Sequence, residues 1–237
     1  EEYTYAKFLE ENENVRTLDP LNLPNGLKIS TMTLTCKIPV KFNVLKIARY
    51  FPLSSSFIHT ITFGNNGEID RTVLQSKSKK RKKKNKGKRN FYNQVTLVAC
   101  VEQYKINIKL FKNGSIQMTG CKMISTVIYA LEKLFAMLKM PVHIKNAKNN
   151  DKKYAEPYIF LNIADIYAFK IAMINSDFDI GFNIDREKLF DKLTKDKYEC
   201  TFDPSRHAGV NIHYKNSNNT LDASGKEHVS IILVFDK

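Results

Sequence analysis

The sequence predicts an α+β fold made of two similar halves. The order of a strand, a short helix and several antiparallel strands occurs twice, in residues 27–140 and 166–237. The dipeptide Asn113-Gly114 separates two runs of alternating polarity, which is the strongest short-range signal for a β-hairpin. Apolar residues recur at helical spacing between Ile124 and Leu138, the longest clean periodicity in the chain. Short antiparallel strands combined with a few helices are typical of α+β proteins.

The chain is long and apolar enough to bury a core, since it has 237 residues, of which 43% are hydrophobic. This composition indicates one large domain or two small ones and excludes a disordered chain. No run approaches the roughly 18 apolar residues that cross a bilayer. The four cysteines lie far apart, without a Cys-x-x-Cys pair, so we expect reduced core thiols of an intracellular protein and no metal site.

In the first half, an acidic tail or short helix at 1–26 precedes the first predicted strand. Alternation predicts the strands, Asn43 is a candidate N-cap for the short helix, and Pro141 ends the long one. The expected elements are a strand at 27–36, a helix at 43–51, strands at 57–63 and 95–101, a hairpin at 104–121 and a helix at 122–140.

In the second half, which follows a linker at 141–165, the same order begins again. Asp185 is the candidate N-cap of its helix. The expected elements are a strand at 168–180, a helix from Asp185 to Leu193, and strands at 197–202, 209–214 and 228–235. A last strand and a long helix matching 122–140 are expected but absent, which predicts that the chain is a fragment or has been cut.

A basic insertion at about 64–94 distinguishes the first half. Residues 77–89 hold ten basic residues and no acid, so the rest of the chain carries only 14 − 10 = +4. A run without apolar residues predicts a solvated, mobile loop. It is either an arm that binds phosphates or a solubilising or nuclear-import segment. The phosphate-binding candidates are Lys79, Lys80, Arg81, Lys82, Lys83 and Lys84.

The hairpin residues 111–122, FKNGSIQMTGCK, resemble the Phe-x-x-Gly-Lys-x-x-x-Thr-Gly-Ala-Lys signature of TATA-box-binding proteins. Residues 29–37 are similar to the first strand of that family. In the second half, residues 202–209 resemble its Tyr-Glu-Pro-Glu-Leu-Phe-Pro-Gly segment, and residues 229–235 resemble the strand before its second signature. The matches keep their order over about 27–237. The divergence and the lysine-rich insertion resemble versions encoded by large DNA viruses.

The resemblance implies a saddle made of two repeats. In this family a curved antiparallel sheet carries helices on its convex face and holds DNA under its concave face, and apolar wedges kink the minor groove. Alternate side chains of each strand would then meet DNA, and their neighbours would meet the helices.

The resemblance and this alternation together give the DNA-binding candidates. Phe111 and Phe235 match wedge positions, and the partner wedges fall on Phe91 and His207. The remaining candidates in the first repeat are Asn107, Lys109, Gln117, Thr119, Ile29, Thr31 and Thr33, and those in the second are Asn175, Val229, Ile231 and Leu233.

Several positions depart from the family pattern. Its two central asparagines fall on Leu27 and Met173, and Asp177 would place a carboxylate near phosphate, which it repels. Ser205 and Arg206 replace the residues that face a partner factor in the family. These departures bear on TATA recognition more than on the saddle.

Two functions are therefore expected. The first is a TATA-box-binding-protein-like transcription initiation factor that bends A·T-rich double-stranded DNA, with other initiation factors or RNA polymerase as partners and no membrane partner. The second is a saddle-shaped structural, packaging or protein-interaction module that no longer kinks DNA. The sequence contains no phosphate loop, no His-Glu-x-x-His motif and no convergent acid pair, so we expect neither an enzyme nor a cofactor. The expected location is intracellular: the nucleus, a viral factory or the virion.

Overall fold

The computed structural model describes residues 5–11, 26–64, 67–74, 92–145, 152–215 and 229–235. The basic run at 77–89 and the wedge candidate Phe91 lie outside these described residues. Within them, no helix has the length and apolar character that a membrane crossing requires. The chain divides into two compact units, residues 1–178 (unit 1) and residues 179–237 (unit 2), and each is described by itself.

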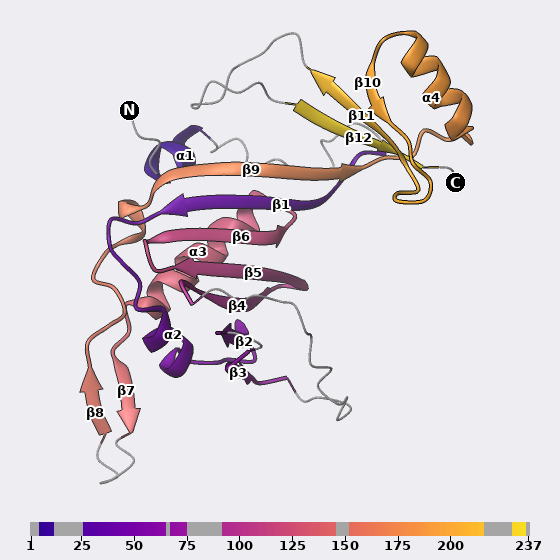
Figure 1. The fold of residues 1–237 in the computed structure, drawn as a ribbon. Coiled ribbons are helices and arrows are strands. Elements are labelled where there is room, and N and C mark those ends of the chain that lie inside the picture. Colours follow the sequence, from indigo (N-terminus) through magenta and orange to yellow (C-terminus); the bar gives the residue numbers. More distant parts are fainter. Residues whose placement is uncertain are drawn as a thin grey trace. The chain divides into compact units, whose positions relative to one another are not determined.

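Unit 1 is built on a seven-stranded antiparallel sheet (Figure 1) with the strand order β3-β2-β4-β5-β6-β1-β9. Three helices and a separate hairpin complete it. The strands of the sheet are β1 (Lys28–Lys37), β2 (Ile58–Phe63), β3 (Ile69–Thr72), β4 (Gln94–Val101), β5 (Tyr104–Phe111), β6 (Ser115–Cys121) and β9 (Tyr167–Asp177). The other elements are α1 (Tyr5–Glu11), α2 (Val44–Tyr50), α3 (Ile124–Leu138), the hairpin β7 (Val142–Lys145) and β8 (Lys152–Ala155), and a 3-10 helix at Ile163–Asp165.

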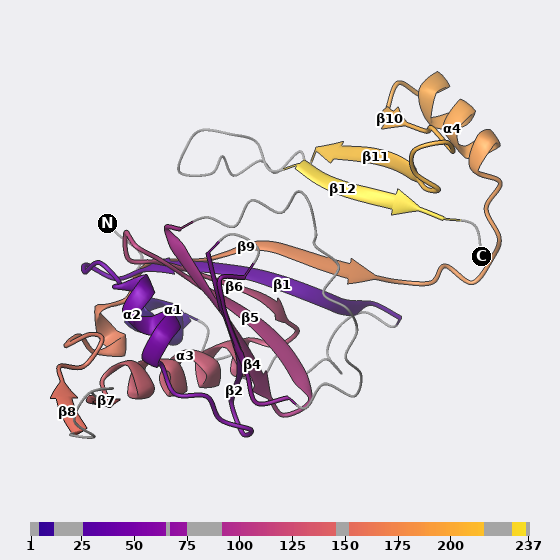
Figure 2. The same ribbon diagram turned by 60° about the horizontal axis from the view of Figure 1, so that its bottom comes forward.

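The helices lie on one face of this sheet, as Figure 2 shows. Helix α3 packs on β4 and β6, and α2 packs on β2 and β4. Alternate side chains of the strands are buried beneath them, for example Leu97, Ile108 and Met118, which are all fully buried. Among the described residues no helix covers the opposite face of the sheet, and we call it the open face of unit 1.

Local sequence signals explain how these elements begin and turn. The Asn43 side chain caps α2 by accepting a hydrogen bond of 3.0 Å from the Lys46 N–H. Gly114 ends the β5–β6 turn at φ +90°, and a Cβ there would lie 2.4 Å from the carbonyl oxygens of Ile38 and Val40. Only glycine fits this position, because it combines a left-handed backbone with close packing.

Unit 2 consists of α4 (Arg186–Lys195) and a three-stranded antiparallel sheet in the order β10-β11-β12. The strands are β10 (Glu199–Thr201), β11 (Val210–Lys215) and β12 (Val229–Val234). Helix α4 contacts β10 and β11. It begins at Asp185, whose carboxylate accepts a hydrogen bond from the Lys188 N–H, and this bond holds the pKa of Asp185 below its usual value. Val210 is the one buried apolar side chain among the residues described in this unit.

The α+β class and the order of elements predicted from the sequence are confirmed. The structure adds strand β3 within the insertion and the β7–β8 hairpin within the segment expected to be a linker. Strands of four residues with little apolar alternation give no clear sequence signal.

The boundary between the units lies after Phe178 and not in the segment 141–165. The reason is that β9, the first strand of the second half, pairs with β1 along its whole length, from Lys28↔Asp177 to Lys37↔Tyr167. The first strands of the two halves are thus antiparallel neighbours, which is the pairing that a twofold axis between two repeats requires.

Candidate nucleic-acid interface

The open face of unit 1 carries two rows of side chains that cross its strands. Residues that pair directly across antiparallel strands share a face, so the strand register defines each row. Row one is Thr62, Thr96, Lys109, Gln117, Thr35 and Lys170. Row two is Thr60, Val98, Asn107, Thr119, Thr33 and Met173.

Polar groups dominate both rows. Hydroxyls and amides can donate and accept hydrogen bonds, and Lys109 and Lys170 add positive charge. No member of either row is acidic, but Asp70 of the edge strand β3 pairs with Thr62 and so lies next to the end of row one. Neighbouring members are separated by about 4.8 Å, the spacing between strands. The open face is therefore a broad array of hydrogen-bonding groups with a positive bias.

The structure brings five of the predicted site residues together in these rows: Asn107, Lys109, Gln117, Thr119 and Thr33. Thr33 is buried, with an exposed fraction of 8%, whereas the other four are exposed or half-buried. Two other predicted residues of β1 are placed differently. The Thr31 hydroxyl accepts a hydrogen bond of 3.1 Å from the Gly120 N–H. Gly120 has φ +87° and lies where the β1–β6 register shifts, so Thr31 satisfies a backbone donor at a β-bulge. Ile29 is partly buried and packs against the core.

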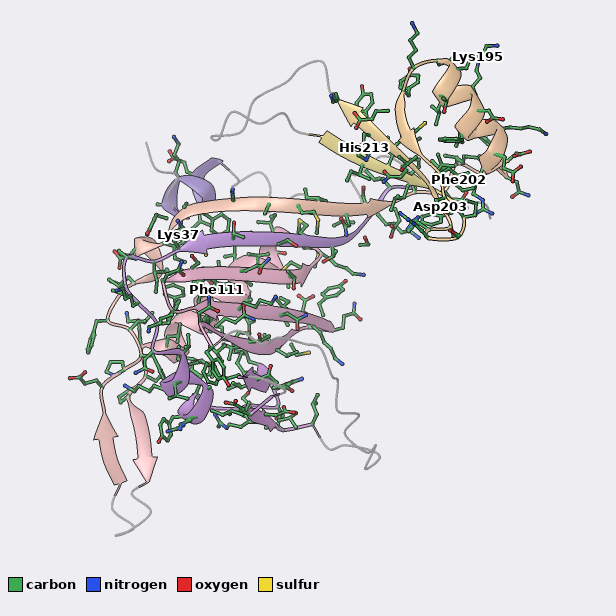
Figure 3. All side chains as sticks on the ribbon, viewed as in Figure 1. Lys37, Phe111, Lys195, Phe202, Asp203 and His213 are labelled. Carbon is green, nitrogen blue, oxygen red and sulfur yellow. The ribbon has the colours of Figure 1, made fainter. Side chains whose placement is uncertain are left out.

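Phe111 ends β5 on the same face as Lys109, and its neighbour Leu110 points the other way and is fully buried. Phe111 pairs with Gln94 of β4 and is half-buried. Figure 3 labels its position in the sheet. Beside it is an open hollow of about 280 Å³, lined by Lys41, Asn93, Phe111, Lys112 and Asn113. We call this the Phe111 hollow; it gave no signal in the sequence, because its residues come from three separate segments.

Among its described residues, unit 2 has its own helix-free face, which is apolar along β12 and polar along β11 and β10. Ile212 and Ile232 pair with each other on the face that α4 covers, and the residues that alternate with them face away from it. Ile231 and Leu233 of the predicted site lie on this second open face, with exposed fractions of 62% and 44%. Val229 begins the same strand, opposite Lys215.

The predicted wedge pair of the second half is assembled in unit 2. The rings of His207 and Phe235 have centroids 5.6 Å apart and are tilted by 51°. A Cβ on Gly209 would lie 3.0 Å from the Phe235 ring, so the ring packs closely on that backbone. Phe235 is nevertheless 51% exposed.

The turn that precedes His207 is organised by Asp203. Its carboxylate accepts hydrogen bonds from the N–H and the hydroxyl of Ser205, at 3.1 and 2.6 Å, and forms an ion pair of 3.3 Å with Arg206. The side chain of Asp203 thus binds groups of its own turn, and Arg206 remains largely exposed.

Acidic groups occur near both open faces. On unit 2, Glu199 lies opposite His213, with 3.1 Å between its Oε1 and His213 Nδ1, and its other oxygen is 3.8 Å from Lys215 Nζ. In unit 1, Asn175 pairs with Thr31, and Asp177 lies opposite Lys28 at the end of β9. Each of the two carboxylates thus has a basic residue beside it or across the strand pair.

The metal-ligating residue types and the cysteines do not form a cluster among the described residues. These residues contain no group of His, Cys, Asp and Glu that could hold a metal. The four cysteines are free thiols, and burial raises the pKa of Cys36 and of Cys121 to about 12. These two thiols therefore stay protonated at neutral pH.

Comparisons with known proteins agree with the sequence resemblance. The chain is 38% identical over 231 residues to a protein of Acanthamoeba polyphaga mimivirus named TATA-box-binding protein-like, a match that covers 90% of this chain. The chain spans 61% of the length of that relative. Among solved structures it is similar to Methanococcus jannaschii TBP, with a TM-score of 0.46, 15% identity, and coverage of 88% of this chain and 82% of that one. No family model matches the sequence.

The hairpin signature at 111–122 is a local resemblance, and the match to the mimivirus relative extends over 231 residues. The predicted resemblance is confirmed by that match. Over 90% of its length, therefore, the chain is similar to a TATA-box-binding-protein-like protein.

Proposed function

We propose that this protein binds double-stranded DNA through the open faces of its two sheets and bends it in the minor groove, as a transcription initiation factor. The observation that carries the proposal is the pair of polar rows on unit 1, which contain no acid and lie beside the half-buried wedge candidate Phe111. A polar, positively biased face fits base edges, sugars and phosphates. We expect A·T-rich duplexes to be preferred, with initiation factors or RNA polymerase as protein partners.

The two open faces contribute differently to this proposal. Unit 1 offers hydroxyls, amides and lysines, which hold a sugar-phosphate backbone by hydrogen bonds and charge. Unit 2 offers Ile231, Leu233 and the His207–Phe235 pair, which can contact unstacked bases without hydrogen bonds. Salt dependence should therefore arise mainly from unit 1 and DNA deformation mainly from the aromatic residues.

The test is a titration of the full chain with A·T-rich and G·C-rich duplexes that carry a fluorescent donor and acceptor at their ends, at two salt concentrations. The expected result is tighter binding to the A·T-rich duplex, weaker binding at high salt, and increased energy transfer as the ends approach. Absence of binding to either duplex would overturn the proposal.

A matched pair of variants connects binding to row one. Gln117→Glu places one negative charge in the middle of the row, and Gln103→Glu places the same charge in the β4–β5 turn. A carboxylate about 4 Å from a phosphate costs about 1 kcal/mol in water and several kcal/mol in a drier interface. We expect roughly tenfold weaker binding for Gln117→Glu and a much smaller change for Gln103→Glu. Equal effects would mean that the row does not contact DNA.

The second candidate function is a structural, packaging or protein-interaction module of the same fold. It is favoured by Met173, which lies in row two with an exposed fraction of 48% where the family has asparagine, and by Glu199 on the open face of unit 2. This candidate predicts binding without a change of end-to-end distance, or no binding at all. The bending measurement therefore separates the two functions.

A further inference from the structure

The Phe111 hollow lies at one end of the open face of unit 1. Phe111 is two residues beyond Lys109 on the same side of β5, which places it about 7 Å past row one. Any duplex that lies across the rows must pass its backbone over this end of the sheet. The hollow is thus a place where a backbone contact would add to the contacts made by the rows.

The side chains around the hollow have the chemistry of an anion site. Lys41 and Lys112 supply two ammonium groups, and Asn93 and Asn113 supply amide donors. None of the five lining residues is acidic, so nothing within this set competes for the ammonium groups. The volume of about 280 Å³ is at the lower limit of small-molecule pockets, which suits a single phosphate and its sugar.

The backbone that carries these side chains is held in place by several hydrogen bonds. The Lys112 N–H donates to the Asn93 carbonyl at 2.7 Å, and the Ser115 N–H donates to the Asn113 side-chain oxygen at 3.1 Å. The Ile38 N–H donates to the Gly114 carbonyl at 3.0 Å, which fixes the segment leading to Lys41 against the same turn. The three segments are therefore joined before any ligand arrives, so little ordering of the backbone is needed on binding.

We propose that the Phe111 hollow binds one phosphate of a nucleic-acid backbone, held by Lys41 and Lys112 beside the ring of Phe111. This inference rests on the proposed function and adds a specific anchor to it. A phosphate fixed next to Phe111 positions the duplex so that the ring meets one particular base step.

The experiment compares two double variants that remove the same charge from the full chain. The first double variant, Lys41→Gln and Lys112→Gln, removes both ammonium groups from the hollow. Lys192→Gln with Lys195→Gln removes two lysines of α4, which covers the other face of its own sheet. All four lysines are exposed, so both variants should unfold at the temperature of the original protein.

The measured quantity is the slope of the logarithm of DNA affinity against the logarithm of salt concentration. Loss of one phosphate contact lowers this slope by about 0.9, so the affinity loss between 50 and 200 mM salt should be about threefold smaller. We expect this change in the hollow variant and not in the α4 variant. Energy transfer at saturating protein should stay unchanged in both, because Phe111 is intact. An unchanged slope in the hollow variant, or equal changes in both, would overturn the inference.

A second measurement distinguishes failure of this inference from failure of the proposed function. If the original protein bound no duplex, the proposed function would fall, and with it the assignment of the phosphate to DNA. Inorganic pyrophosphate is then titrated into the original protein and the hollow variant, and the side-chain amide NMR signals of Asn93 and Asn113 are followed. If the NMR signals shifted in the original protein and not in the hollow variant, the hollow would still be a phosphate site. If they shifted in neither protein, the inference would be overturned.

Discussion

Phe111 and Leu110 are adjacent residues of β5 whose side chains point to opposite faces of the sheet. Leu110 is fully buried under the helices, whereas Phe111 borders the hollow on the open face. Truncation of a buried leucine removes packing contacts and so lowers the stability of the fold. A ring at the edge of the open face contributes mainly to the binding of a ligand on that face. Along β5, residues that stabilise the core therefore alternate with residues that are available for binding.

We expect Phe111→Ala to reduce DNA bending more than it reduces stability, because a flat ring can replace lost base stacking in a kinked step. Leu110→Ala should do the reverse and cost about 2–5 kcal/mol of unfolding free energy. End-to-end fluorescence transfer measures the first effect and thermal or denaturant unfolding measures the second. If Phe111→Ala unfolded the protein while Leu110→Ala left it stable, the two faces would be assigned the wrong way round. Unchanged bending in a stable Phe111→Ala protein would favour the structural-module function.

The four thiols should differ in reactivity according to burial. Cys36 and Cys121 are buried and have pKa values of about 12, whereas Cys100 and Cys200 are only partly buried. The thiolate is the reactive form, so a thiol reagent at neutral pH should label Cys100 and Cys200 first. Mass spectrometry of labelled peptides identifies the sites. Rapid labelling of Cys36 in the folded protein would contradict its burial.

The same pKa values give a pH dependence of stability. A folded-state pKa above the ordinary value of 9.0 means that the folded state retains the thiol protons more strongly than the unfolded chain does. The stabilisation is therefore complete below pH 9 and is lost as the pH rises from 9 towards about 12. Replacing Cys36 or Cys121 by Ala should reduce this alkaline loss, which urea unfolding at several pH values would measure.

At the scale of single elements, the β5–β6 hairpin takes part both in the packing of unit 1 and in the Phe111 hollow. Its turn supplies two lining residues of the hollow, and Gly114 packs the turn onto the carbonyls of Ile38 and Val40. The hairpin thus connects the open face to the segment that leads into α2. A change in the turn should alter stability and binding together.

Gly114→Ala and Gly26→Ala form a matched pair that tests this packing. Both residues have positive φ, at +90° and +86°, so alanine in this left-handed conformation should cost about 1–2 kcal/mol of stability at each position. At Gly114 the new Cβ would also lie 2.4 Å from two carbonyl oxygens, whereas at Gly26 nothing lies within 4 Å. We therefore expect Gly114→Ala to cost clearly more than about 2 kcal/mol in denaturant unfolding. Equal costs for the two variants would show that the close packing of Gly114 is not required.

At the scale of the whole molecule, the two units differ strongly in how much apolar surface they bury. Unit 1 has a continuous core beneath its helices. The described part of unit 2 buries only Val210 among its apolar side chains, and leaves Ile231, Leu233 and Phe235 exposed. Burial of apolar surface is the main stabilising contribution in folding, so unit 2 is the less stable of the two by itself.

Hydrogen exchange should resolve this difference. We expect the amides of β4, β5 and β6 to exchange last, at a rate that reports global unfolding, and those of β11 and β12 to exchange earlier through local opening. Adding an A·T-rich duplex should slow exchange in β12 if its open face contacts DNA. Equal protection of the two units in the free protein would contradict the ranking.

Much of the fold followed from local sequence patterns. Alternating runs, the Asn113-Gly114 turn, the Asn43 and Asp185 caps and the helical periodicity ending at Leu138 all predicted elements that the structure contains. These signals are readable because each is short-range: a cap, a turn or a period depends on residues only a few positions apart.

The candidate site was predictable only in part. Alternation alone put Asn107, Lys109 and Phe111 on one side of β5 and Gln117 and Thr119 on one side of β6. It could not show that the Gly120 N–H, at a β-bulge, donates a hydrogen bond to the Thr31 hydroxyl, because the two residues are 89 positions apart in the sequence.

The sequence by itself thus determined the class of fold, the family resemblance and the faces of individual strands. Only the tertiary structure decided that β9 pairs along the whole of β1, that the two polar rows cross five neighbouring strand pairs, and that Lys41 and Lys112 line one hollow beside Phe111. The physical reason is that strand periodicity fixes a side chain's face from its neighbours, whereas register and pocket lining depend on contacts between distant segments.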